Sequence, residues 1–175
     1  MSRFLAGFMT AMPLALVAAA SLAGEGFRFA SIDGGEIDLD DWRGKPVLVV
    51  NTASLCGYAG QFDGLQALHE RFGDRTLILA VPSDDFEQEL ANEAAVKEYC
   101  AMTFDLTLPM TEITHVTGPE AHPFYAWVRA QTGFEPRWNF NKVLIAPDGS
   151  IAATFGAPVK PESAAIAGRI EAMLE

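Results

Sequence analysis

The sequence predicts an α/β domain in which helices flank a central mixed β-sheet. Two observations carry this prediction. Strand-like and helix-like segments alternate along the chain, and its last two strand-like segments are joined by Pro147-Asp148-Gly149-Ser150, which is typical of a tight antiparallel hairpin. In addition, the alternating segment 27–39 holds Gly34-Gly35 after Asp33, so it predicts an N-terminal β-hairpin.

The first half of the chain supplies the centre of the sheet. A strand is expected over 47–52, and within it Leu48, Val49 and Val50 are continuously apolar, which is typical of a strand covered on both faces. Apolar residues then recur at helical spacing from Phe62 to Phe72 and stop at Gly73, which predicts a helix. A second strand is expected over 76–81, and a helix over 93–102 with Asn92 as its N-cap.

The second half completes the domain. Residues 106–113 are expected to be extended, and a helix is expected to start at Pro119 and end at Gly133. Strands at 143–145 and 151–155 form the closing hairpin, and Pro161 is expected to open a terminal helix. Right-handed crossovers together with a closing antiparallel hairpin make a thioredoxin-like fold the most economical topology.

The N-terminus predicts export. Residues 1–23 combine Arg3, a long apolar stretch and the small-residue exit Ser21-Leu22-Ala23, which is the pattern of a secretory signal peptide cleaved after Ala23. Residues 24–175 would then form a single domain in the periplasm or outside the cell, without stable membrane association. The alternative is an uncleaved membrane anchor, because the apolar stretch approaches spanning length, although Pro13 weakens it.

Composition narrows the possible partners. The chain carries 12 Lys and Arg against 23 Asp and Glu, a net charge of −11, so it should repel nucleic acid and anionic membranes. Plain solubility is the simpler meaning of this charge. The three histidines lack metal-ligand spacing, and we expect neither a metal nor another cofactor.

The two cysteines, Cys56 and Cys100, leave two interpretations open. In an exported protein they could form a structural disulfide or a redox pair. Cys56 follows the apolar strand where a helix is expected to begin, and there backbone N–H groups and the helix dipole can stabilise a thiolate. A buried, inert cysteine is the alternative. Because residue 59 is alanine, the chain lacks the Cys-x-x-Cys motif typical of general disulfide exchangers.

Four blocks resemble the glutathione peroxidases in their cysteine-containing form. They occur in the family's order, at spacings near those of the family, and the similarity runs from about residue 27 to the C-terminus. The resemblance implies a thioredoxin-like fold, in agreement with the topology above. The blocks are Val50-Asn51-Thr52-Ala53-Ser54-Leu55-Cys56-Gly57-Tyr58, Leu79-Ala80-Val81-Pro82-Ser83-Asp84-Asp85-Phe86, Ala121-His122-Pro123-Phe124-Tyr125 and Trp138-Asn139-Phe140-Asn141-Lys142-Val143-Leu144-Ile145.

The resemblance implies reduction of hydrogen peroxide or organic hydroperoxides by a thiolate at Cys56, with Trp138 and Asn139 in supporting positions. Attack on an O–O bond requires a thiolate, and an ordinary thiol with a pKa of about 8.5 is only a few per cent ionised near neutrality. An indole N–H and a carboxamide N–H can both donate hydrogen bonds to the charged sulfur and to the leaving oxygen. Core packing for Trp138 and a turn role for Asn139 remain alternatives.

The chain departs from the family pattern at Asp85. The family usually has Asn-Gln where this chain has Asp84-Asp85, so Asp85 takes the place of a supporting glutamine. An ionised aspartate accepts hydrogen bonds and cannot donate them, and its charge beside sulfur disfavours a thiolate. We therefore expect this chain to be a weaker peroxidase than its relatives in the family. Gln88 is a candidate replacement donor, and its loop, residues 86–90, is one residue shorter than the family's.

Cys100 falls near the position of a resolving cysteine in thioredoxin-dependent members of the family. The resemblance then implies that Cys100 attacks a Cys56 sulfenic acid and that a thioredoxin-like dithiol, or glutathione, reduces the disulfide. Because Cys100 lies on a predicted helix, pairing requires local unravelling. The short connection from Gly133 to Trp138 lacks the insertion of tetrameric members, so a monomer is expected. A thioredoxin-fold binding protein with a structural disulfide is the alternative.

Overall fold

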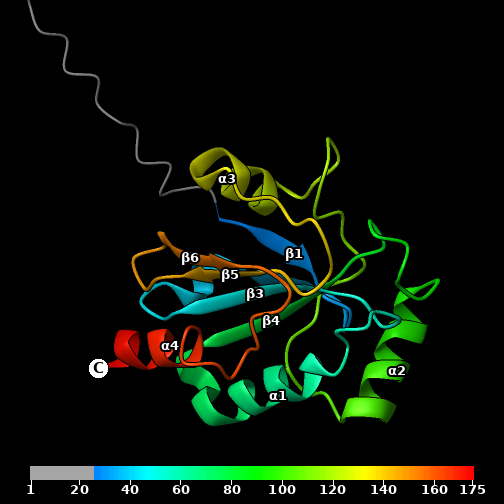
Figure 1. Ribbon diagram of the computed structural model, residues 1–175, viewed down its shortest axis with the longest axis horizontal. Helices are drawn as coiled ribbons and strands as arrows, with labels where there is room; N and C mark the ends of the chain where they lie inside the picture. The colour runs from blue at the N-terminus through cyan, green and yellow to red at the C-terminus, as the bar shows by residue number, and fades with distance from the viewer. Residues whose placement is uncertain (1–25) are drawn as a thin grey trace, which may run out of the picture.

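The computed structural model describes residues 26–175 (Figure 1). Within this range a four-stranded mixed sheet has the order β4-β3-β5-β6. Strand β3 (Val47–Thr52) pairs in parallel with β4 (Leu77–Pro82) and antiparallel with β5 (Lys142–Ile145), and β5 pairs antiparallel with β6 (Ile151–Phe155). The predicted central mixed sheet and closing hairpin are therefore confirmed.

A separate two-stranded sheet forms the predicted N-terminal hairpin. Its strands are β1 (Arg28–Ala30) and β2 (Glu36–Asp38), followed by the 3-10 helix η1 (Leu39–Trp42). The extended segment expected at 106–113 joins this hairpin to the main sheet, because Met110 bridges to Ala80 of β4 and Thr111 bridges to Ser31.

Helices cover both faces of the main sheet. In Figure 1, α1 and α4 lie on one side of the sheet and α3 on the other. The helices are α1 (Gln61–Phe72), α2 (Glu93–Phe104), α3 (Pro123–Thr132) and α4 (Ala167–Leu174), and the 3-10 helix η2 (Gly73–Arg75) follows α1.

Strand β3 is buried along its whole length, as the apolar run Leu48-Val49-Val50 predicts. Successive side chains of a strand point to opposite faces, and β3 divides accordingly. Leu48 and Val50 enter the core that contains α1 and α4, whereas Val47 and Val49 enter the core that contains α3. Burial of each such side chain contributes roughly 1.5–3 kcal/mol, so this strand is a rigid support for the residues that follow it.

Two predicted helix starts are wrong. Helix α3 begins at Pro123 rather than Pro119. Pro119 belongs to a turn in which Ala121 N donates a hydrogen bond to Gly118 O. The side chain of His122 then caps the helix by accepting a hydrogen bond from Phe124 N at 3.2 Å. Helix α4 begins at Ala167 rather than Pro161. Residues 161–166 form turns with bonds between residues three apart, before the helical ladder starts.

Helix α2 is two residues longer than expected. The predicted N-cap is confirmed, since the Asn92 side chain accepts a hydrogen bond from Ala95 N at 3.0 Å. The helix continues to Phe104 and ends at Asp105, which adopts a left-handed conformation with φ 52° and donates its N–H to Ala101 O. Cys100 is therefore one turn inside the helix and not at its end. Strand β4 runs from Leu77 to Pro82, one residue later than expected.

The predicted signal peptide, residues 1–23, lies outside the described residues. Within 26–175, no helix is both long enough and apolar enough to cross a membrane.

Candidate active site

Cys56 lies in the turn that connects β3 to α1. Strand β3 ends at Thr52 and the helix starts at Gln61, so the first helical turn is five residues beyond the cysteine and not directly after it, as the sequence had suggested. The Cys56 Sγ atom accepts a hydrogen bond from Tyr58 N at 3.4 Å. A backbone N–H therefore contacts the sulfur, although it belongs to a turn rather than to the helix.

Cys56 is buried. It is 5% exposed, whereas the neighbouring Leu55 is 60% exposed. The cysteine is therefore largely shielded from solvent but stands next to an exposed residue in the chain. Within residues 26–175, Cys56 and Cys100 are both free thiols, so the structure contains no structural disulfide between them.

Asn51 connects the end of β3 to the loop that carries Trp138 and Asn139. Its Nδ2 donates to Trp138 O at 3.0 Å, and its Oδ1 accepts from Asn141 N at 3.0 Å. Its backbone oxygen also accepts from Phe140 N, and Phe140 has a positive φ of 61°, which costs a non-glycine residue free energy. This buried asparagine sets the position of the 138–141 loop, a role that the sequence alone did not indicate.

The side chains of Trp138 and Asn139 lie on this loop but do not bond to the sulfur in this structure. Trp138 is 41% exposed, and its ring packs against Phe86 with centroids 5.7 Å apart. Asn139 is fully buried, and its Nδ2 donates to Gln88 Oε1 at 3.4 Å. Its Oδ1 is buried without a hydrogen-bond partner in the described part of the chain.

The Asp85 carboxylate is engaged by a different segment. It accepts hydrogen bonds from Val116 N at 2.6 Å and Thr117 N at 3.0 Å, and its other oxygen is 2.6 Å from His115 Nδ1. The carboxylate beside it raises the pKa of His115. The hydrogen bonds of Asp85 thus hold residues 115–117, and the structure does not join this side chain to Cys56.

Gln88, unlike Asp85, is hydrogen-bonded to the loop that carries Cys56. Its backbone oxygen accepts from Leu55 N at 2.9 Å, next to Cys56 in the chain, and its side chain meets Asn139. The next residue, Glu89, accepts from Ser54 N at 3.0 Å. Hydrogen bonds donated by the backbone N–H groups of Ser54 and Leu55 therefore join residues 88–89 to the loop that carries Cys56.

Cys100 is buried within α2, with 2% of its surface exposed. Burial, together with the nearby charge of Glu89, raises the pKa of the Cys100 thiol to about 12. Cys100 also lines a surface hollow between α2 and the N-terminal hairpin, together with Ile32, Lys97 and Leu106. Both cysteines belong to one hydrophobic core cluster.

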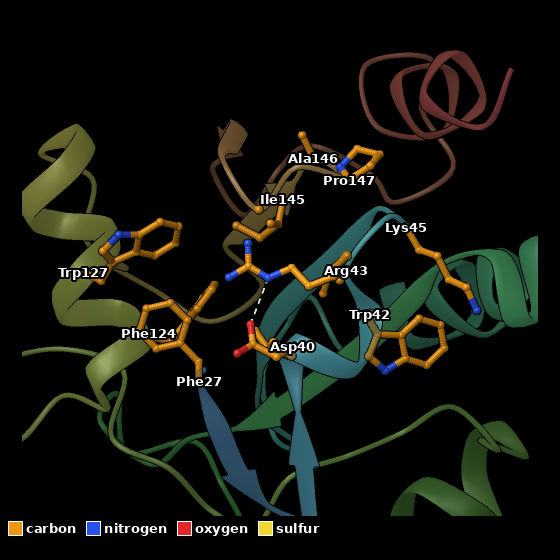
Figure 2. Close-up of a pocket in the computed structure, with 13 residues that line it drawn as sticks. Phe27, Asp40, Trp42, Arg43, Lys45, Phe124, Trp127, Ile145, Ala146 and Pro147 are labelled. Atoms are coloured by element: carbon orange, nitrogen blue, oxygen red, sulfur yellow. Dashed lines mark hydrogen bonds and ion pairs between the residues drawn. The ribbon is translucent and has the colours of Figure 1, made fainter. Parts of the chain in front are cut away.

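A more apolar pocket lies elsewhere. Figure 2 shows Phe27, Phe124 and Trp127 around it, beside the ion pair of Arg43 with Asp40. Val47, at the start of β3, lines this pocket, whereas Cys56 follows the end of the same strand. The pocket is therefore at the opposite end of the sheet from the thiol. Within residues 26–175, no group of three His, Cys, Asp or Glu side chains is arranged to hold a metal ion.

Known glutathione peroxidases are similar to this chain in both sequence and fold. The model of the family described as glutathione peroxidase matches residues 26–129. Hydroperoxy fatty acid reductase gpx1 of Synechocystis sp. is 37% identical over 161 residues, covering 85% of this chain and 94% of the relative. The crystal structure of Trgpx in apo form superimposes with a TM-score of 0.66 at 28% identity, covering 85% of this chain and 93% of that one.

The fold extends to more distant proteins. A thiol:disulfide interchange protein of the thioredoxin family from Chlorobium tepidum TLS has a TM-score of 0.61 at 18% identity, covering 86% of this chain and 94% of that one. The chain thus has a thioredoxin-like fold. It belongs to the glutathione peroxidase family and is a thiol-dependent peroxidase.

Proposed function

We propose that Cys56 is the nucleophile that reduces the peroxide, and that Cys100 and a thioredoxin-like dithiol regenerate it. The observation that carries this proposal is the place of Cys56. Cys56 lies in the turn after a fully buried strand, next to the exposed Leu55, and its sulfur accepts a hydrogen bond from the backbone N–H of Tyr58. Hydrogen bonds from a fixed backbone favour a thiolate, which is the reactive form.

In the reaction, the Cys56 thiolate attacks one peroxide oxygen and the O–O bond breaks. The sulfur becomes a sulfenic acid, and the leaving oxygen takes a proton to become water or an alcohol. The Cys100 thiol then displaces hydroxide from the sulfenic acid, which forms a disulfide that a dithiol, or glutathione, reduces.

The proposed supporting donors are Trp138, Asn139 and Gln88. The carboxylate of Asp85 is committed to the 115–117 segment, so it supplies no donor to the sulfur. The Gln88 carboxamide has its oxygen toward Asn139, which leaves its N–H₂ group available, and its backbone already contacts the loop of Cys56. Gln88 thus takes over the donor role that an aspartate cannot fill.

The surface beside the thiol suits an organic hydroperoxide as well as hydrogen peroxide. Leu55 and Trp138 are two large hydrophobic side chains that are exposed, and Phe86 packs against the second. The relative from Synechocystis is named a hydroperoxy fatty acid reductase. An apolar rim can accept the hydrocarbon part of such a substrate while the peroxide group reaches the sulfur.

We further propose that the protein is exported and acts as a monomer. The signal pattern of residues 1–23 supports export, and the short connection between Gly133 and Trp138 supports an open, monomeric site. N-terminal sequencing of protein recovered from the periplasm or medium tests the first point, since it should begin at Gly24. A protein retained in the cytoplasm with Met1 intact would contradict it.

The enzymatic test is peroxide consumption with either a thioredoxin-type dithiol or glutathione as the reductant. We expect turnover with the dithiol, a loss of at least about 100-fold in Cys56→Ser, and loss of dithiol-driven turnover in Cys100→Ser. The catalytic role of Cys56 would be contradicted by equal peroxide consumption in wild type and Cys56→Ser. A wild-type protein that consumes no peroxide would instead favour a binding role.

A further inference from the structure

Lys142 is a fully buried lysine whose ammonium group is surrounded by neutral oxygen acceptors. Its Nζ donates to Gln61 Oε1 at 2.6 Å. It also donates to the backbone oxygens of Val159 at 2.5 Å and Ala157 at 3.2 Å. Within residues 26–175, no carboxylate lies within salt-bridge distance of this group. A buried charge without an opposite charge costs free energy, so its retention calls for a functional explanation.

Gln61 connects this ammonium group to the turn of Cys56. It is the first residue of α1, and the preceding Gly60 has no side chain that could cap the helix. The Gln61 side chain accepts from Lys142 and donates to the backbone oxygen of residue 157 at 2.8 Å, so both of its polar atoms are held. Its backbone N–H donates to Tyr58 O at 2.8 Å. Lys142 therefore helps to fix the start of α1, where no side chain caps the helix.

Tyr58 carries the connection to the sulfur. Its backbone N–H donates to Cys56 Sγ at 3.4 Å, while its backbone oxygen is held by Gln61 N. The same turn is closed by Ala59 N, which donates to Cys56 O at 2.9 Å. Successive hydrogen bonds thus lead from Lys142 through Gln61 and Tyr58 to the sulfur. An N–H that is held in place favours a thiolate more than a mobile one, because it needs no reorientation when the charge forms.

Building on the proposed role of Cys56 as the nucleophile, we infer that Lys142 is a positioning residue for the reaction. Through Gln61, it holds the Tyr58 N–H against the sulfur. Within residues 26–175 it makes no hydrogen bond to the sulfur itself, so it acts through these partners. Its backbone begins β5 directly after the 138–141 loop, so it connects that loop to the Cys56 turn. Burial lowers the pKa of Lys142 to about 8, so at pH 7 most molecules keep three N–H donors for the three acceptors.

Lys142→Met removes the three donors and keeps a side chain of similar length. The readout is the pH dependence of Cys56 alkylation by iodoacetamide, with the label located by peptide mass spectrometry. We expect the midpoint of this profile to rise by about one pH unit, so that the thiolate present at pH 7 falls about tenfold. A merely looser structure would change the plateau rate and not the midpoint. Lys160→Met, which removes an exposed lysine of the segment after β6, is the matched control and should keep the wild-type midpoint.

Gln61→Met distinguishes the hydrogen-bonded path from a direct effect of the charge. It leaves the Lys142 ammonium in place and removes the acceptor that links it to the Cys56 turn. We expect a similar rise of the midpoint, and a double variant whose shift is no larger than the larger single shift, because both changes break one link. Gln61 is only partly buried, so this variant keeps the inference testable if loss of the buried lysine prevents folding. Urea unfolding of each variant verifies that it is folded.

The outcomes separate this inference from the proposed function. A wild-type midpoint in folded Lys142→Met or in Gln61→Met would overturn the role of Lys142 and leave the peroxidase intact. Additive shifts in the double variant would also overturn it, because the two side chains would then act independently. Failure of hydrogen peroxide to oxidise Cys56 in the wild type would contradict the proposed function itself, and it would be seen before any variant is compared.

Discussion

Asp85 illustrates how a single side chain is assigned its role by distant partners. Its carboxylate binds two backbone N–H groups and the His115 ring, and its charge adds to the burial that raises the pKa of Tyr125, which lies buried nearby. A carboxylate suits this place because it accepts several hydrogen bonds at once. At this position the chain has a structural acceptor in place of a donor to sulfur.

The His115–Asp85 pair predicts a pH-dependent contribution to stability. Because Asp85 raises the folded-state pKa of His115 above its ordinary value, the pair stabilises the fold fully below about pH 6.5, and the contribution is lost as pH rises through the raised value. His115→Gln should therefore lower the free energy of unfolding more at pH 6 than at pH 9. The side chain is 61% exposed, so solvent screening keeps this difference below about 1 kcal/mol.

Urea unfolding of wild type and variant at both pH values measures this difference. His69→Gln, on helix α1 and outside the pair, is the control substitution. An effect of His115→Gln that is equal at the two pH values would contradict the ion pair.

The sequence proposes candidate residues for the site but does not predict their contacts. Cys56 and the Trp138-Asn139 pair are proposed because they stand in blocks that resemble the glutathione peroxidases. The sequence did not reveal that Asp85 turns toward residues 115–117, nor that Asn51 holds the 138–141 loop. These contacts join residues about 30 and 90 positions apart, and no local pattern encodes such pairings.

At the scale of elements, α2 is held at both ends by its caps. The Asn92 side chain caps the first turn, and Asp105 closes the last turn in a left-handed conformation. Neither the preceding residues 89–92 nor the segment after Phe104 continues the helix. Because Cys100 is one turn from the C-terminal end, the caps determine how readily this thiol can leave its buried position.

Asn92→Ala should destabilise the protein by about 1 kcal/mol, because Ala95 N loses its acceptor. The midpoint of urea unfolding measures this. We expect disulfide formation after peroxide to be at least as fast as in wild type, since a loosened α2 releases Cys100 more easily. Glu98→Ala, on the exposed face of the same helix, should change stability by less than about 0.5 kcal/mol. An unchanged unfolding midpoint in Asn92→Ala would show that the cap is not needed.

The same caps explain which helix ends were predictable. Asn92 and Gly133 mark ends through local chemistry that a sequence shows directly. Pro119 and Pro161 can start a helix equally well in sequence, but here each lies in a turn that precedes the helix. Helix α3 starts after the His122 cap, and helix α4 starts after the turns over 161–166, so both begin later in the chain than the prolines suggest.

In the molecule as a whole, the segments that carry the proposed site residues meet where the parallel strands β3 and β4 end. Ligands of open α/β sheets bind beyond the carboxyl ends of such strands. The turn with Cys56 follows β3, the segment 84–90 follows β4, and the 138–141 loop leads into β5.

Lys142, at the start of β5, is buried and donates to Gln61 and to the backbone oxygens of Ala157 and Val159, so it joins α1 to the segment that follows β6. Burial lowers its pKa to about 8.

In the proposed reaction, the sulfur of Cys56 reacts with peroxide and passes its oxidation to Cys100. The mass of the intact protein after one equivalent of hydrogen peroxide tests it most directly, with Cys56→Ser and Cys100→Ser measured in parallel. We predict a loss of two hydrogens in wild type, a gain of one oxygen in Cys100→Ser and no change in Cys56→Ser. An unchanged wild-type mass, or an oxygen added equally to Cys56→Ser, would contradict the account.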